Sequence, residues 1–255
     1  MTNKEKEFWE QWQPTARTCL CFILRGEEIL LIRKKRGIGA GKINGPGGHI
    51  EPGESALESA IREVQEELGV TPCNLKERGE LSFQFIDEVT GKDQQMNDGV
   101  SGALHCVVFT AEGCIGEPQE TEEAIPYWTH HENIPYHEMW EDDREWLPGM
   151  LTRIFHTNLL RKLGRPMNAA LGSGFGLDSM YTYSPASKSS PASPHQPSQL
   201  SRHDQYEISE LPRILNAPSA AACSKSMTTV LDEKFFNGYY FFDQDKLLSG
   251  HVLWK

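Results

Sequence analysis

Residues 45–70 read GPGGHIEPGESALESAIREVQEELGV, and the second half of this stretch has the pattern of one amphipathic helix. Ser55 and Glu58 have the spacing of a capping box and Gly69 follows the last periodic residue, so we predict a helix from Ser55 to Leu68. At about 100° per residue, its apolar stripe faces a core and its acidic residues occupy a separate arc, outside the buried stripe. The apolar stripe consists of Leu57, Ala60, Ile61, Val64 and Leu68.

Three carboxylates crowd the polar arc of this helix. Glu63, Glu66 and Glu67 share one face, where like charges cost about a few tenths of a kcal/mol per pair. A bound cation would remove that repulsion. Carboxylate oxygens are the ligands that Mg²⁺ prefers, and Mn²⁺ can substitute for it. The alternative is an ordinary solvated helical face, which is what most acidic runs are.

Strand-forming runs surround the helix. Residues 18–24 and 29–35 predict a hairpin, 81–89 and 102–113 two further strands, and 125–130 a short one. The loop 37–54 holds seven glycines and two prolines, so it predicts a tightly turning connection that lets backbone approach a ligand closely. A second helical pattern begins near Asp142.

The composition changes late in the chain. Between residues 184 and 201, serine and proline fill 11 of 18 positions, and such a segment buries too little apolar surface to offset the entropy of ordering it. We therefore predict a main domain in residues 1–164, a low-complexity, disordered insert in 165–229, and strands in 230–255 that complete the main domain.

The acidic helix and the loop before it match one motif at every fixed position, and the chain therefore resembles the Nudix hydrolases. The resemblance implies an α/β fold with a mixed sheet between helices, and hydrolysis of a diphosphate linkage with Mg²⁺. It also implies that Glu54 and Arg62 form a structural ion pair. Glu67 is the first choice for the base that activates water, and Glu123 is the alternative. The matching motif residues are Gly48, Glu54, Arg62, Glu63, Val64, Glu66, Glu67, Gly69 and Val70. The implied metal ligands are Gly48, Glu63, Glu66, Glu67 and Glu123.

The resemblance extends beyond the motif, because residues 34–55 and 133–148 resemble segments of animal oxidised purine nucleoside triphosphatases. That resemblance implies hydrolysis of 8-oxo-dGTP and 2-hydroxy-dATP, which sanitises the nucleotide pool against DNA damage. Adjacent carboxylates in a cleft disfavour double ionisation, so Asp142 and Asp143 can offer a base both a donor and an acceptor. Ile38 and Leu104 depart from this family's pocket, which puts the base preference in doubt. The implied substrate-binding residues are Thr18, Lys34, Asn44, Phe83, Phe85, Trp140, Asp142 and Asp143.

Two other functions stay open: a Nudix hydrolase of ADP-ribose or a dinucleotide, and a catalytically weak nucleotide-binding module whose insert recruits an unknown protein. The formal charge of −11 argues against broad binding to nucleic acid or an anionic membrane. The N-terminus shows no signal or transit pattern and no apolar run is long enough to span a membrane, so we expect a cytoplasmic monomer acting on cytoplasmic, and in a eukaryote nuclear or mitochondrial, nucleotides. His130 and His131 are expected to point to opposite sides of a strand, which argues against a metal site there.

Overall fold

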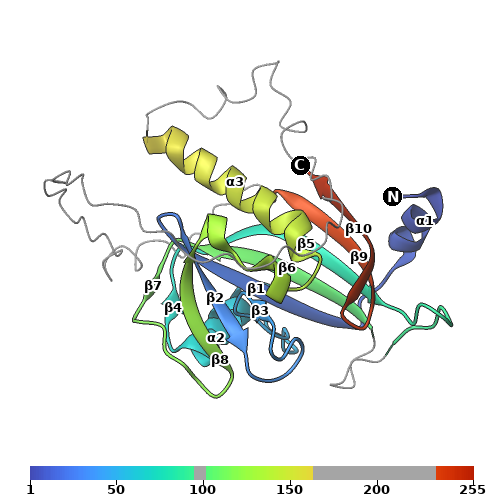
Figure 1. The fold of residues 1–255 in the computed structure, drawn as a ribbon, viewed down its shortest axis with the longest axis horizontal. Helices are drawn as coiled ribbons and strands as arrows, with labels where there is room; N and C mark the ends of the chain where they lie inside the picture. Colours follow the sequence, from blue (N-terminus) through green and yellow to red (C-terminus); the bar gives the residue numbers. More distant parts are fainter. Residues whose placement is uncertain (95–101, 163–233) are drawn as a thin grey trace, which may run out of the picture. The chain divides into compact units, whose positions relative to one another are not determined.

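The structure, a computed structural model, describes residues 1–94, 102–162 and 234–255. Within these ranges eight strands form one mixed sheet, in the order β10-β9-β5-β6-β1-β2-β3, with β8 also paired to β2 (Figure 1). The predicted insert, 165–229, lies outside the described residues. The strands are β1 (Ala16–Arg25), β2 (Glu28–Lys34), β3 (Ile43–Asn44), β5 (Lys76–Phe85), β6 (Ala103–Ala111), β8 (Ala124–His130), β9 (Phe236–Asp243) and β10 (Lys246–Trp254).

Two parallel pairings make the sheet mixed. β1 runs parallel to β6, and β9 runs parallel to β5, while β1–β2, β2–β8, β5–β6 and β9–β10 are antiparallel. The pairing of β9 with β5 places the end of the chain inside the same sheet as its first half. A short separate ladder joins β4 (Thr71–Pro72) to β7 (Cys114–Ile115).

Helices cover both faces of this sheet, as predicted. α2 (Ala56–Leu68) packs Val64 and Leu68 against Cys21 and Ile23 of β1, whereas α3 (Asp143–Lys162) packs on the opposite face, where Phe22 points. Neighbouring residues of a strand face opposite ways, so one strand serves both cores. Each fully buried side chain of this size contributes about 1.5–3 kcal/mol.

The predicted limits of the acidic helix are confirmed. Ser55 caps α2 in a capping box with Glu58, and Gly69 ends it in the left-handed conformation, with φ of 69°. The expectation that the acidic arc stays outside the buried surface is wrong for Glu67, which is 1% exposed. Its side chain turns under the glycine loop.

An N-terminal helix, α1 (Asn3–Gln11), packs on the C-terminal strands. The Trp9 ring contacts Tyr239 and Phe241 of β9, with centroid distances of 5.4 and 4.8 Å. Two short 3-10 helices, η1 (His131–Asn133) and η2 (Tyr136–Glu138), lead from β8 towards α3. None of the helices in the described ranges combines the length and apolar character that a membrane span requires.

Candidate active site

One cleft of about 670 Å³ brings together most of the residues predicted for catalysis and binding. Glu66 and Glu54 are the two that do not line it. The predicted residues that do are Thr18, Lys34, Asn44, Gly48, Arg62, Glu63, Glu67, Phe83, Phe85, Glu123, Trp140, Asp142 and Asp143.

A pair of glycines positions the carboxylates at one end of the cleft. The backbone N–H of Gly47 donates to Oε2 of Glu67 over 2.9 Å. The next residue, Gly48, lies directly against the Glu63 carboxylate, and its carbonyl accepts the N–H of Cys19 at 2.9 Å. A Cβ on Gly47 would stand 2.1 Å from the Cys19 carbonyl oxygen, and one on Gly48 would stand 2.5 Å from the Glu63 carboxylate. Backbone can therefore approach these acids only because neither residue carries a side chain.

Two basic side chains partly neutralise the crowded acids. Nζ of Lys34 lies 3.3 Å from Oε1 of Glu67. Arg62 bonds to Glu63 at 2.8 Å and to Glu66 at 3.0 Å.

Arg62 also forms the ion pair that the motif implies. Its guanidinium makes two bonds to the Glu54 carboxylate, at 2.9 and 3.0 Å, and donates to the His49 carbonyl at 2.9 Å. These bonds lower the pKa of Glu54 to about 2. They tie the end of the glycine loop to the first half of α2.

Burial disfavours the negative charge of the carboxylates at this end of the cleft. It raises the pKa of Glu63 and of Glu67 above their ordinary values, although Arg62 and Lys34 oppose the shift. Glu123 lies at the same cleft, where Arg36 pairs with it. The Glu63 and Glu67 carboxylates and the nearby Gly48 carbonyl are a donor set of hard oxygens, which fits Mg²⁺ or Mn²⁺.

Changing Gly48 to Ala tests the close approach of the loop to Glu63. The new Cβ displaces the carboxylate, so we expect kcat to fall roughly 10- to 100-fold, as when the support of a metal ligand is lost. Steady-state kinetics on the purified variant measure this.

The control is the same change in a Glu63→Ala background. If the added methyl group acts only through Glu63, Gly48→Ala has little further effect there. Equal losses in both backgrounds would show that the methyl group disturbs something else.

Two buried aspartates mark the other end of the cleft. Oδ2 of Asp143 accepts the backbone N–H of Trp140 at 3.2 Å, and Oδ2 of Asp142 accepts the indole N–H of Trp146 at 3.0 Å. Each aspartate thus has one oxygen held by the protein. The Asp142 and Asp143 side chains are 2% and 3% exposed.

Burial raises the pKa of Asp142 to about 7 and also raises that of Asp143, which the neighbouring Asp142 charge pushes further. Between pH 3.8 and about 7, the folded protein therefore keeps a proton on the pair that the unfolded chain, with an ordinary aspartate pKa of 3.8, has released. Stability from this pair is complete below the unfolded pKa and is lost as the pH rises through about 7.

We expect a double variant, Asp142→Asn with Asp143→Asn, to gain stability relative to the wild type as the pH rises from about 4 to about 8. Asparagine keeps an oxygen for each N–H but carries no charge to bury. Urea unfolding of both proteins at several pH values measures the difference. A difference that is constant or shrinks with rising pH would contradict the raised pKa values.

Further predicted residues complete the walls. Thr18 lies on β1 and Asn44 on β3, where Asn44 Oδ1 accepts the Gly45 N–H at 2.8 Å. Phe83 and Phe85 pack with the core on the α3 face and also line the cleft.

Some cleft residues escaped the sequence analysis. Phe242 of β9 stacks on Phe85, with centroids 5.5 Å apart, and meets the Trp140 ring edge-on at 5.9 Å. The alternating aromatic residues of β9 are visible in the sequence. The pairing of β9 with β5, however, joins residues more than 150 positions apart, and no local pattern encodes it. Leu81 and Cys106 line the cleft as well.

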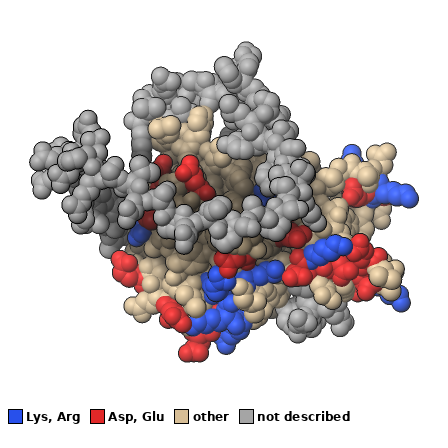
Figure 2. All heavy atoms as spheres, viewed as in Figure 1, with Lys and Arg blue, Asp and Glu red and all other residues tan. Residues whose placement is uncertain are grey.

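The charge distribution is mixed outside the cleft. Figure 2 shows Lys and Arg interspersed with Asp and Glu over the described part of the face in view. Basic residues near the cleft are mostly paired, for example Lys35 with Glu120 at 2.5 Å.

Comparison with known proteins gives a consistent result. The NUDIX domain model matches residues 14–150. The oxidized purine nucleoside triphosphate hydrolase of Danio rerio is 38% identical over 134 residues, which are 52% of this chain and 78% of that protein. A NAD-capped RNA hydrolase NudC of Pseudomonas syringae is 41% identical over 118 residues, 46% of this chain and 36% of that protein. The crystal structure of a MutT protein from Bacillus halodurans has a TM-score of 0.51 at 18% identity, covering 93% of this chain and 97% of the other, which shows a shared fold.

Proposed function

The chain belongs to the Nudix hydrolase family, and from this premise we propose that it hydrolyses oxidised purine nucleoside triphosphates with Mg²⁺, giving the monophosphate and pyrophosphate. The substrates we propose are 8-oxo-dGTP and 2-hydroxy-dATP, and the role is to keep damaged nucleotides out of DNA synthesis.

The observation that carries the proposal is the arrangement of a single cleft. Its carboxylate end holds Glu63 and Glu67, and its other end holds Trp140 and the aspartate pair. A cleft of this size, with acids at one end and an aromatic ring with polar partners at the other, suits a nucleotide lying along it.

The oxygens of Glu63, Glu66, Glu67 and Gly48 would hold the magnesium ion, with Glu123 close by. When bound, the ion neutralises charge on the phosphates and on the developing transition state. Glu66 is exposed, and one of its two carboxylate oxygens is bonded to Arg62.

Glu67 is the proposed base that takes a proton from the attacking water. Its burial raises its pKa, and a base with a raised pKa accepts a proton more readily near neutral pH. Lys34, 3.3 Å from Glu67, is proposed to contact phosphate oxygens of the substrate rather than its nucleobase. Glu123 stays the alternative general base, and it pairs with Arg36 at the same cleft.

The aspartate pair is proposed to read the oxidised base. Guanine N7 is a hydrogen-bond acceptor, whereas the 8-oxo base carries a proton there. An ionised aspartate can therefore accept a hydrogen bond from N7–H of the lesion, but it finds no donor at N7 of unmodified guanine. The second, neutral aspartate donates to an acceptor of the same base. Trp140 stacks on the ring.

A second candidate is hydrolysis of ADP-ribose or a dinucleotide. The NudC relatives favour it, because their name states NAD-capped RNA as the substrate. The carboxylate end of the cleft suits any diphosphate linkage. Only the end with Trp140 and the aspartate pair can therefore distinguish the two candidate substrate classes.

A substrate panel tests the proposal. We expect kcat/KM to be highest for 8-oxo-dGTP or 2-hydroxy-dATP, with pyrophosphate as a product, and lower for dGTP, ADP-ribose and NAD. A preference for ADP-ribose or NAD would select the second candidate. Tight nucleotide binding without Mg²⁺-dependent turnover of any of them would indicate a binding module.

We further propose that residues 1–164 and 230–255 make up this catalytic domain as a monomer in the cytoplasm, and that residues 165–229 interrupt it as a segment open to a protein partner. Removing 165–229 and joining the ends with a short Gly/Ser linker should leave kcat/KM within about threefold. Sedimentation of the full chain gives its oligomeric state.

A further inference from the structure

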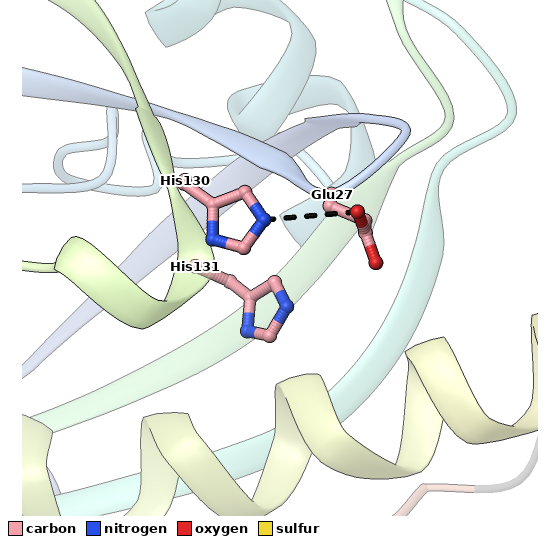
Figure 3. A group of neighbouring side chains, drawn as sticks. All are labelled: Glu27, His130 and His131. Carbon is pink, nitrogen blue, oxygen red and sulfur yellow. Dashed lines mark ion pairs between the residues drawn. The ribbon is translucent and has the colours of Figure 1, made fainter. Parts of the chain in front are cut away.

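A cluster outside the cleft brings two histidines and a glutamate together. Glu27 lies in the turn between β1 and β2, His130 ends β8, and His131 begins η1. One ligand atom from each lies within 4.8 Å of the others (Figure 3). None of these three described residues lines the cleft.

The two histidines do not point to opposite sides, and that expectation is wrong. The strand ends at His130 and η1 starts at His131, so the alternation of a strand stops between them. Their rings stack, with centroids 4.7 Å apart and planes at 27°. Both rings therefore face the same turn.

Backbone pairing holds the turn and the histidines together. Glu28 pairs with His130 in the β2–β8 ladder, and the His131 N–H donates to the Glu27 carbonyl at 3.0 Å. The positions of all three residues are thus fixed by the sheet. The Glu27 side chain is 75% exposed, and its carboxylate already faces the His130 ring.

Neighbouring side chains orient the imidazoles. The His131 ring lies against Phe155 of α3, with a centroid distance of 4.5 Å. Nε2 of His130 faces the Glu27 carboxylate at 3.7 Å, and Nδ1 faces the Glu132 carboxylate, also at 3.7 Å. Nδ1 of His130 also accepts the backbone N–H of Glu132 at 3.4 Å, which orients this ring.

We propose that Glu27, His130 and His131 form a second metal site, selective for Zn²⁺ over Mg²⁺. Two imidazole nitrogens and one carboxylate oxygen are a zinc donor set, with water as the fourth ligand, whereas Mg²⁺ prefers oxygen alone. Bonds of about 2 Å in a tetrahedral site put donors about 3.3 Å apart, so donors that lie within 4.8 Å of one another must close in by up to about 1.5 Å, and the exposed Glu27 side chain permits that.

The site is separate from the carboxylates of the cleft. The register of β2 with β8 runs from Glu28 and His130 at the cluster to Lys34 and Ala124 at the cleft, which is about 20 Å of strand. A zinc ion there would link the β1–β2 turn to the end of β8 and to His131, whose ring packs on α3. It would act on stability and not on the chemical step.

Cobalt spectroscopy on the full chain, with Mg²⁺ in excess, tests the proposal. Co²⁺ in a four-coordinate nitrogen and oxygen site absorbs visible light far more strongly than Co²⁺ bound by six oxygens. We expect one equivalent of Co²⁺ to give the strong bands, and Zn²⁺ to displace it and raise the melting temperature.

Variants locate the ion. Glu27→Gln and His131→Gln should each weaken Co²⁺ and Zn²⁺ binding roughly tenfold or more, and Glu27 is exposed, so its change leaves folding intact. His156→Gln, an exposed histidine outside the cluster, should have no effect. Weak bands only, or strong bands lost in Glu67→Gln but kept in His131→Gln, would overturn the proposal.

Discussion

Replacing Glu67 by Gln is expected to lower kcat about 10²- to 10⁴-fold, the range in which a general base contributes. The change keeps the size of the side chain and an oxygen for the Gly47 N–H, but removes the negative charge and the proton acceptor. Because burial opposes that charge, the variant should be as stable as the wild type or more so. Pyrophosphate release and thermal unfolding of the same preparation measure both effects.

Two further variants decide between the candidate bases. Glu123→Gln should cost less than Glu67→Gln if Glu67 is the base. Glu122→Gln, an exposed neighbour, serves as the control and should be neutral. Near-normal turnover in Glu67→Gln together with a large loss in Glu123→Gln would move the base to Glu123.

Replacing Asp143 by Asn is expected to reduce discrimination between oxidised and normal purine. The kcat/KM ratio of 8-oxo-dGTP to dGTP should fall about 10- to 100-fold, which corresponds to losing one hydrogen bond, of about 1.5–3 kcal/mol, from the singly charged aspartate pair. The amide still accepts the Trp140 N–H, so the ring that stacks on the base stays in place. Asp142→Asn should act in the same direction.

Glu141→Gln is the matched control for this change, because Glu141 precedes the pair in the chain and is exposed. It should leave the substrate ratio unchanged. A ratio that is also unchanged in Asp143→Asn, with both substrates still hydrolysed, would remove the aspartate pair from base recognition.

Local patterns predicted the parts of this site that lie close in sequence. The capping box and Gly69 set the limits of α2, and the spacing of Glu63, Glu66 and Glu67 places them on one face. Helical periodicity missed the burial of Glu67, because the glycine loop that covers it is irregular and its path depends on close backbone contacts with β1.

Contacts between distant segments could not be read from the sequence. The pairing of β9 with β5 brings Phe242 to the cleft, and a change from strand to 3-10 helix after His130 stacks two histidines that strand alternation would separate. Both depend on tertiary structure that overrides local preference.

We propose that hydrolysis requires a divalent ion bound by the carboxylates of α2. Pyrophosphate release from 8-oxo-dGTP, followed before EDTA, after EDTA and after excess Mg²⁺ is restored, tests it directly. We predict that EDTA stops the reaction, that Mg²⁺ restores it in the wild type, and that Mg²⁺ does not restore it in a Glu63→Ala, Glu67→Gln double variant. Hydrolysis that continues at the same rate in EDTA would contradict the account.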